Sequence, residues 1–182
     1  MDKFIRIFVV VTFLASYTQA FGGFGHLKTV LDKSSDMPRF SCDICIPDAC
    51  ALNVKPGTMT IKGHNVAYKV YSPQLFPVTK PPLITLHGGP GASSSYMYPM
   101  QALACEGREV VLYDQMGCGD SWTPKNVEKE APWLLTISYY VDELEALVNH
   151  LEYEEVYVFG HSWGTVVSQE YAFRQRSQLK GL

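Results

Sequence analysis

Three short, mainly apolar runs stand out along the chain, at residues 83–86, 110–113 and 156–159. Continuous apolar strands of this kind are typical of a parallel sheet that is buried on both faces. Between the last two runs, residues 138–151 carry apolar side chains at helical spacing, namely Val141, Leu144, Val148 and Leu151. The alternation of strand, helix and strand predicts an α/β fold with a parallel sheet.

The charged residues of the 138–151 stretch suit the dipole of a helix, with Asp142 and Glu143 expected in its first turn and His150 in its last. Upstream, apolar positions alternate in residues 58–71 on either side of Gly63-His64-Asn65. This alternation predicts a β-hairpin with one buried face. Residues 21–57 carry scattered glycines and prolines without a sustained period, so we expect a loop-rich extension there.

The first 20 residues have a different pattern. Lys3 and Arg6 precede an apolar stretch of about nine residues, and the segment ends in Thr18-Gln19-Ala20. A basic start, a short apolar stretch and a small-residue exit are typical of a secretory signal peptide, whereas a membrane-spanning helix needs about 20 apolar residues. We therefore expect cleavage after Ala20, export from the cell or into the secretory lumen, and one folded domain at 58–182.

Five cysteines follow the predicted cleavage site: Cys42, Cys45, Cys50, Cys105 and Cys118. An oxidising compartment favours disulfides, and the crowding of three cysteines within residues 42–50 predicts a local bond whose pairing the sequence leaves open. A zinc site is the alternative, but no second Cys or His pair follows at finger-like spacing. The net charge of −3 gives no basic surface for nucleic acid or an anionic membrane, so neither is expected as a partner of the mature chain.

Candidate chemistry begins directly after the third apolar run, in the segment Gly160-His161-Ser162-Trp163-Gly164. Gly-x-Ser-x-Gly between a buried strand and a helix is typical of a sharp turn that presents a nucleophilic serine. The turn strains the serine backbone, and a glycine two residues to each side relieves the crowding. Ser162 is therefore the candidate nucleophile, and an ordinary serine in a glycine-rich turn is the alternative interpretation. His161 is not expected to act as its base, because adjacent strand-end residues point apart.

A second glycine-rich segment ends the first apolar run, with the sequence His87-Gly88-Gly89-Pro90-Gly91. A tetrahedral oxyanion needs two convergent N–H donors, and glycines let the main chain approach it closely. The expected donors are the backbone N–H groups of Gly89 and Trp163. A phosphate-binding loop is the alternative, but its lysine, its Ser/Thr and the full Gly-x-Gly-x-x-Gly spacing are missing. His87 by itself is expected to be a packed loop histidine.

A third segment follows the second apolar run, with Asp-Gln-Met-Gly-Cys-Gly-Asp-Ser at 114–121. It is expected to be a structural polar turn, because Asp114 precedes Ser162 and the hydrolase order is Ser, then Asp or Glu, then His. Together the three segments resemble the proline iminopeptidase (prolyl aminopeptidase) family of the α/β-hydrolase superfamily, over roughly residues 58–182. The sequence departs from that family at Met116, where arginine is frequent, and at Thr165, where glycine or serine is usual.

The resemblance implies a serine peptidase that needs no cofactor and releases an N-terminal residue, often proline, from peptides or from amino-acid amides and esters. The 20 residues after Ser162 contain neither histidine nor aspartate, so we expect an incomplete α/β-hydrolase fold that lacks the cap, the C-terminal strands and the triad Asp and His. Such a chain is expected to be inactive by itself. Two alternatives stay open: a secreted carboxylesterase or lipase, and a truncated binding protein without catalytic activity.

Overall fold

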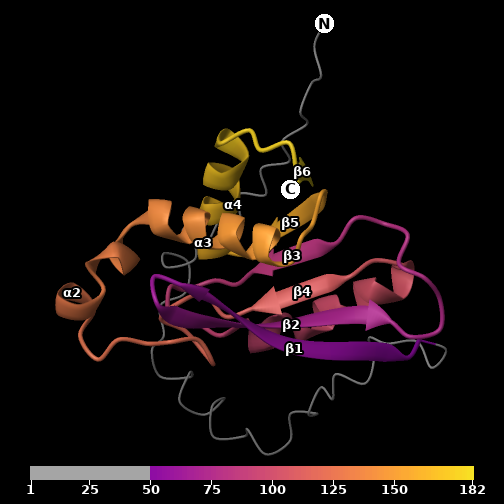
Figure 1. Ribbon diagram of the computed structural model, residues 1–182, viewed down its shortest axis with the longest axis horizontal. Coiled ribbons are helices and arrows are strands. Elements are labelled where there is room, and N and C mark those ends of the chain that lie inside the picture. Colours follow the sequence, from indigo (N-terminus) through magenta and orange to yellow (C-terminus); the bar gives the residue numbers. More distant parts are fainter. Residues whose placement is uncertain (1–49) are drawn as a thin grey trace, which may run out of the picture. The chain divides into compact units, whose positions relative to one another are not determined.

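The computed structural model describes residues 50–182; the predicted signal peptide, Cys42, Cys45 and nearly all of the predicted extension lie outside them. The core of the fold is a six-stranded sheet with the order β1-β2-β4-β3-β5-β6 (Figure 1). The strands are β1 (Leu52–Ile61), β2 (His64–Pro73), β3 (Leu83–Leu86), β4 (Val110–Tyr113), β5 (Val156–Gly160) and β6 (Leu179–Gly181). The β1–β2 hairpin joins β4 antiparallel, and the pairs β3–β4, β3–β5 and β5–β6 are parallel. The predicted α/β fold is confirmed.

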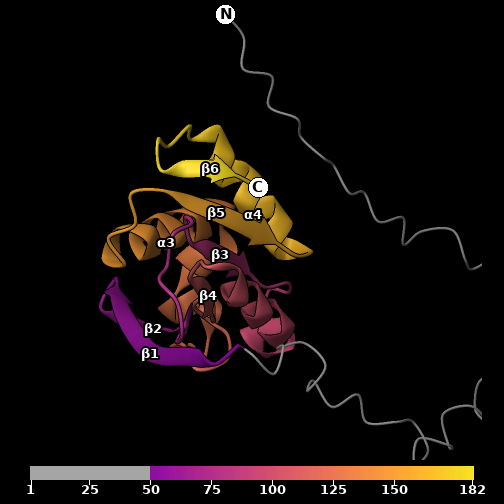
Figure 2. The ribbon, with the colours of Figure 1, turned by 90° about the vertical axis from the view of Figure 1, so that its right-hand side faces the viewer.

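Helices cover both faces of the sheet. They are η2 (Ser94–Glu106), α2 (Val127–Glu130), η3 (Pro132–Leu135), α3 (Ile137–His150) and α4 (Trp163–Phe173). The side chains of α3 and α4 share one apolar core with β3, β4 and β5, whereas η2 packs with β2 and β4 in a second one. Figure 2 accordingly shows α3 and η2 on opposite sides of β3 and β4. Among residues 50–182, no helix combines the length and the apolar character needed to cross a membrane.

The hairpin is longer than its sequence pattern predicts, since β1 already begins at Leu52 and the loop-rich extension therefore ends before it. Pro56 lies within β1, opposite Lys69 of β2, and is tolerated because β1 is the outermost strand of the sheet. A Cβ atom on Gly57 would lie 2.4 Å from the ring of Tyr68, so the missing side chain makes room for that ring. The turn is Lys62-Gly63 rather than Gly63-His64-Asn65, and both of its residues have positive φ.

The helix predicted at 138–151 corresponds to α3, with one correction to its charges. It starts at Ile137, directly after the extended residue Thr136, so Asp142 and Glu143 lie in its second turn and not in its first. Glu143 is fully buried, whereas Asp142 lies on the exposed side. His150 lies in the last turn, as predicted.

The third apolar run differs from the other two. β3 and β4 are buried throughout, but in β5 the side chains of Tyr157 and Phe159 are 37% and 41% exposed. These two side chains lie on the face of the sheet that packs against η2. This helix covers β2 and β4 on that face but does not cover β5. The prediction that this strand is buried on both faces is therefore wrong within the described part of the chain.

A disulfide joins Cys50 to Cys105, with their Cα atoms 5.8 Å apart and a sequence separation of 55. Cys50 directly precedes the hairpin and Cys105 lies in the last turn of η2, so the bond ties the hairpin to the helix that packs against it. The expectation of a local bond within residues 42–50 is wrong for Cys50, because the packing of η2 brings a distant cysteine beside it. Cys118 is buried and carries a free thiol.

Candidate functional site

The turn from β5 into α4 has the geometry that the Gly-x-Ser-x-Gly pattern predicts. Ser162 has φ 52° and ψ −116°, a conformation that residues with a side chain rarely adopt. A Cβ atom on Gly160 would lie 2.4 Å from the carbonyl oxygen of Gly164, and one on Gly164 would lie 2.1 Å from that of Leu86. Only glycine therefore fits at the positions two residues before and two residues after Ser162. The side chain of Ser162 itself is exposed, so its hydroxyl is accessible to a substrate.

The segment 87–91 lies against this turn. A Cβ atom on Gly88 would be 3.1 Å from Cβ of Ser162, which places the two glycine-rich segments in direct contact. Gly89 has φ 127°, a backbone conformation that glycine adopts readily and that residues with a side chain rarely adopt. Neither its N–H nor that of Trp163 donates a hydrogen bond to another atom of residues 50–182. For Trp163 this follows from its place as the first residue of α4, where the helix offers no acceptor.

His87 is a structural residue, as its sequence context indicates. It is buried, its Nδ1 donates to the carbonyl oxygen of Gly88 at 2.8 Å, and its Nε2 accepts the N–H of Gln115 at 2.9 Å. Burial lowers the pKa of the His87 imidazole, so the ring is neutral near pH 7. Because both ring nitrogens are used in this way, His87 holds the loop in place and is not available as a base.

Gln115 connects all three glycine-rich segments, which the sequence did not indicate. Its amide nitrogen donates to the carbonyl oxygen of His87 at 2.9 Å, and its amide oxygen accepts the indole N–H of Trp163 at 3.0 Å. One side chain thus fixes the first residue of α4 relative to the end of β3. The buried position of Gln115 beside a polar loop could not be recognised from the sequence, because its partners lie 28 and 48 residues away.

Asp114 has the structural role that its position before Ser162 favours. Its carboxylate accepts the N–H of Ser94 at 2.6 Å and the N–H of Asp120 at 2.8 Å. The hydroxyl of Ser121 donates to the carbonyl oxygen of Asp114 and accepts the N–H of Ala67 at 2.8 Å. These contacts close the 114–121 turn and join it to η2 and to β2.

A buried carboxyl group lies beneath the same turn. Glu143 of α3 is fully buried, and its carboxyl oxygens accept the N–H of Met116 at 3.1 Å and the hydroxyl of Tyr139 at 3.0 Å. Within residues 50–182 no basic side chain forms an ion pair with it. Burial raises the pKa of Glu143 to about 8, because the charged form loses its hydration. Glu143 is therefore an uncharged acid at neutral pH. The sequence pattern of residues 138–151 did not indicate that this glutamate is buried.

His161 precedes Ser162 and is exposed, but its Nδ1 is 2.9 Å from the hydroxyl of Tyr96 in η2. The same hydroxyl accepts the N–H of Gly88 at 2.5 Å. This arrangement directs His161 toward η2, in keeping with the expectation that it does not serve as the base for Ser162. Tyr96 was not among the residues that the sequence singled out.

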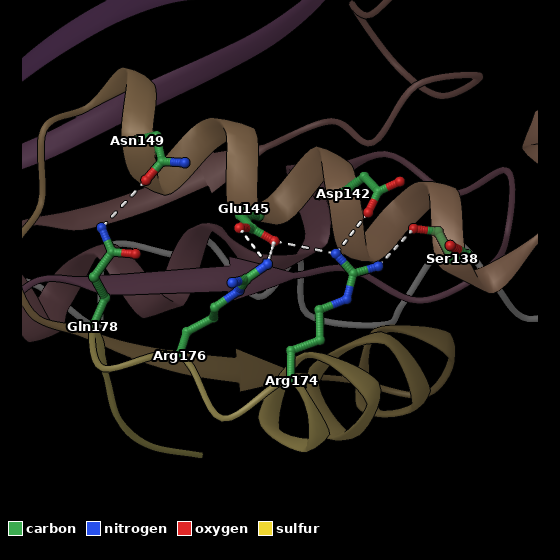
Figure 3. A network of polar contacts seen from close by, with 7 residues as sticks. All are labelled: Ser138, Asp142, Glu145, Asn149, Arg174, Arg176 and Gln178. Carbon is green, nitrogen blue, oxygen red and sulfur yellow. Dashed lines mark hydrogen bonds and ion pairs between the residues drawn. The ribbon is translucent and has the colours of Figure 1, made fainter.

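Ion pairs hold the end of α4 against α3 (Figure 3). Arg174, which follows α4, contacts Asp142 at 2.6 Å and Glu145 at 3.1 Å, and Arg176 contacts Glu145 at 2.7 Å. Gln178 adds a hydrogen bond to Asn149 at 3.3 Å. Partly exposed pairs of this kind stabilise a protein only weakly one by one, but here several share Arg174 and Glu145 and so orient the helix that begins at the Ser162 turn.

Comparison with known proteins gives consistent matches. A sequence model described as alpha/beta hydrolase fold matches residues 81–182. The proline iminopeptidase of Lactobacillus helveticus is 36% identical over 118 residues, which are 64% of this chain and 38% of that protein. The crystal structure of the proline iminopeptidase from Mycobacterium smegmatis has a TM-score of 0.62 and 36% identity over 69% of this chain and 41% of its own. The structure of VinJ has a TM-score of 0.63 and 33% identity over 70% and 42%.

The region that the sequence model matches includes all three glycine-rich segments, since it begins at residue 81 and continues to residue 182. The chain spans about 40% of the length of the proteins that it matches.

Proposed function

Because the chain belongs to the α/β-hydrolase family, we propose that Ser162 is the nucleophile of a serine hydrolase of the proline iminopeptidase type, which releases N-terminal residues from peptides. The observation that supports this most directly is the positive-φ turn at Ser162, in contact with Gly88 of the facing loop. In this mechanism the hydroxyl oxygen of Ser162 attacks the substrate carbonyl. The free N–H groups of Gly89 and Trp163 stabilise the negative charge that develops on the carbonyl oxygen.

The general base is the part of the mechanism that residues 50–182 do not supply. His87 is engaged at both ring nitrogens and His161 contacts Tyr96. His64 stacks on Trp122, and His150 contacts the hydroxyl of Tyr68. The residues that follow Ser162 include neither histidine nor aspartate. We propose that the 182-residue polypeptide by itself does not turn over substrate. When a triad member is lost, the oxyanion hole and binding alone retain roughly 10³-fold catalysis over water. We therefore expect Ser162 to react once with a strong electrophile faster than other exposed serines do, although steady turnover is not expected.

The test is covalent labelling with a fluorophosphonate, followed by mass spectrometry of the labelled peptide. We expect Ser162 to react at least about 100-fold faster than the exposed Ser138, in line with oxyanion stabilisation. The variant Ser162→Ala should lose this fast labelling, whereas the control Ser138→Ala should keep it. Equal labelling of exposed serines, or steady hydrolysis of a prolyl naphthylamide that persists in Ser162→Ala, would contradict the proposal.

We also propose that the protein is exported after cleavage behind Ala20. The Cys50–Cys105 disulfide supports this, because structural disulfides persist in oxidising compartments and are rare in the cytosol. Expression of the full chain in a secretory host should yield exported protein whose N-terminal residue is Phe21. Retention of the intact N-terminus inside the cell would contradict export.

A further inference from the structure

Tyr96 occupies a special position between the two segments of the site. It belongs to η2, which contributes no residue to either glycine-rich segment, yet its hydroxyl lies 2.5 Å from the amide nitrogen of Gly88 and 2.9 Å from Nδ1 of His161. Gly88 immediately precedes Gly89, and His161 immediately precedes Ser162. One hydroxyl group therefore contacts the neighbour of an oxyanion donor and the neighbour of the nucleophile.

The direction of the two hydrogen bonds follows from the chemistry of the groups. The amide of Gly88 can only donate, so the oxygen of Tyr96 accepts from it. The hydroxyl of Tyr96 keeps its own proton, and Nδ1 of His161 at 2.9 Å is the acceptor within reach. We assign the hydrogen bond in this direction, which places the proton of a neutral His161 on Nε2.

The absence of a side chain on Gly88 is what allows this arrangement. A Cβ atom there would lie 3.2 Å from both the hydroxyl oxygen of Tyr96 and Nδ1 of His161, and 3.1 Å from Cβ of Ser162. The three side chains thus meet around one glycine. Since Tyr96 belongs to a helix, its hydroxyl can hold two loops that otherwise belong to different strands.

We propose that Tyr96 is a positioning residue, which sets the distance between the Gly89 and Trp163 amides by joining the 87–91 loop to the Ser162 turn. This inference rests on the proposed function, because it assigns these amides to the oxyanion. Small displacements of reacting groups lower rates strongly, by up to about 100-fold for 1 Å. A hydroxyl that fixes two loops against each other is accordingly expected to affect the rate of reaction at Ser162 more than it affects folding.

Tyr96→Phe and Tyr98→Phe form a matched pair for the test. Both residues are exposed tyrosines of η2, but the hydroxyl of Tyr98 contacts Lys69 and not the site. We expect Tyr96→Phe to slow fluorophosphonate labelling of Ser162 by at least about tenfold, with Tyr98→Phe at the wild-type rate and both variants unfolding at the same urea concentration. Wild-type labelling in Tyr96→Phe, or an equal loss in both variants, would overturn the assignment.

Nitrogen NMR of the histidine rings provides a readout that does not depend on reactivity. In the full chain, His161 should be protonated on Nε2, and Tyr96→Phe should shift it toward a mixture of the two neutral tautomers. Tyr98→Phe should leave the tautomer unchanged. If Ser162 fails to label even in the wild type, the proposed function is wrong; a tautomer shift confined to Tyr96→Phe would then still support Tyr96 as the link between the loops, and an unchanged tautomer would overturn it.

Discussion

Replacing Glu143 by glutamine is expected to remove a large pH dependence of folding stability and to make the protein more stable than the wild type above pH 8. The pKa of Glu143 is raised by burial from its ordinary 4.5 to about 8 in the folded protein. Between these two values the folded state keeps a proton that the unfolded state has released. Stability contributed by the protonated group is therefore complete below about pH 4.5 and is lost as the pH rises through about 8.

The expected size follows from the linkage of one proton. The free energy of unfolding of the wild type should fall, relative to the variant, by up to about 1.4 kcal/mol for each pH unit within this window. Glutamine cannot ionise, but with its oxygen in the Oε1 position it can still accept the N–H of Met116, and with its nitrogen in the Oε2 position it can donate to the hydroxyl of Tyr139. The other titratable groups that face Glu143 are uncharged here, since burial raises the pKa of each of them, namely Tyr113, Cys118, Tyr139 and Tyr140.

Urea unfolding at several pH values between 5 and 9 measures this difference. The exposed Glu154 provides the control, because Glu154→Gln should leave the wild-type pH profile unchanged. Parallel profiles for the wild type and Glu143→Gln across the whole range would show that Glu143 ionises normally, and would contradict the assignment of an uncharged acid beneath the 114–121 turn.

Breaking the Cys50–Cys105 disulfide is expected to lower the free energy of unfolding by about 4 kcal/mol. The bond closes a loop of 55 residues, and in the chain-entropy model a loop of this length restricts the unfolded state by roughly that amount. The effect should be seen in Cys105→Ser and in the reduced wild type alike, as a lower midpoint in urea unfolding.

The double variant Cys50→Ser/Cys105→Ser is the control for reduction. Dithiothreitol should not change its unfolding midpoint, whereas it should lower that of the wild type to nearly the same value. A midpoint that falls equally in the wild type and in the double variant would assign the stabilisation to other cysteines. A fully reduced wild type with an unchanged midpoint would show that the bond adds no stability.

Much of the fold could be predicted from local patterns, because the signals are local. The apolar runs at 83–86 and 110–113 coincide with β3 and β4, and the stripe at 138–151 matches α3 within one residue at each end. The Ser162 turn was also predictable, because its signal lies in the five consecutive residues 160–164. A strained serine in such a turn requires glycine two residues before it and two residues after it. Pro56 and Gly57, by contrast, suggested a loop, although an edge strand accommodates both.

What the sequence could not show are contacts between residues far apart in the chain. Tyr96 is 65 residues from His161, Glu143 is 27 from Met116, and Cys50 is 55 from Cys105. Each of these contacts depends on how η2 and α3 are placed on the sheet, and no periodicity within a single element encodes that placement. The same holds for the exposed side of β5, because burial of a strand depends on which helices cover it.

The proline in the outermost strand also affects how copies of the protein can associate. Pro56 has no N–H group, so the free border of β1 lacks one of the donors that an incoming strand would need. A strand from another chain that pairs with this edge of β1 would therefore lack one of the backbone hydrogen bonds. The proline that made β1 hard to recognise in the sequence thus hinders edge-to-edge pairing of this strand with another chain.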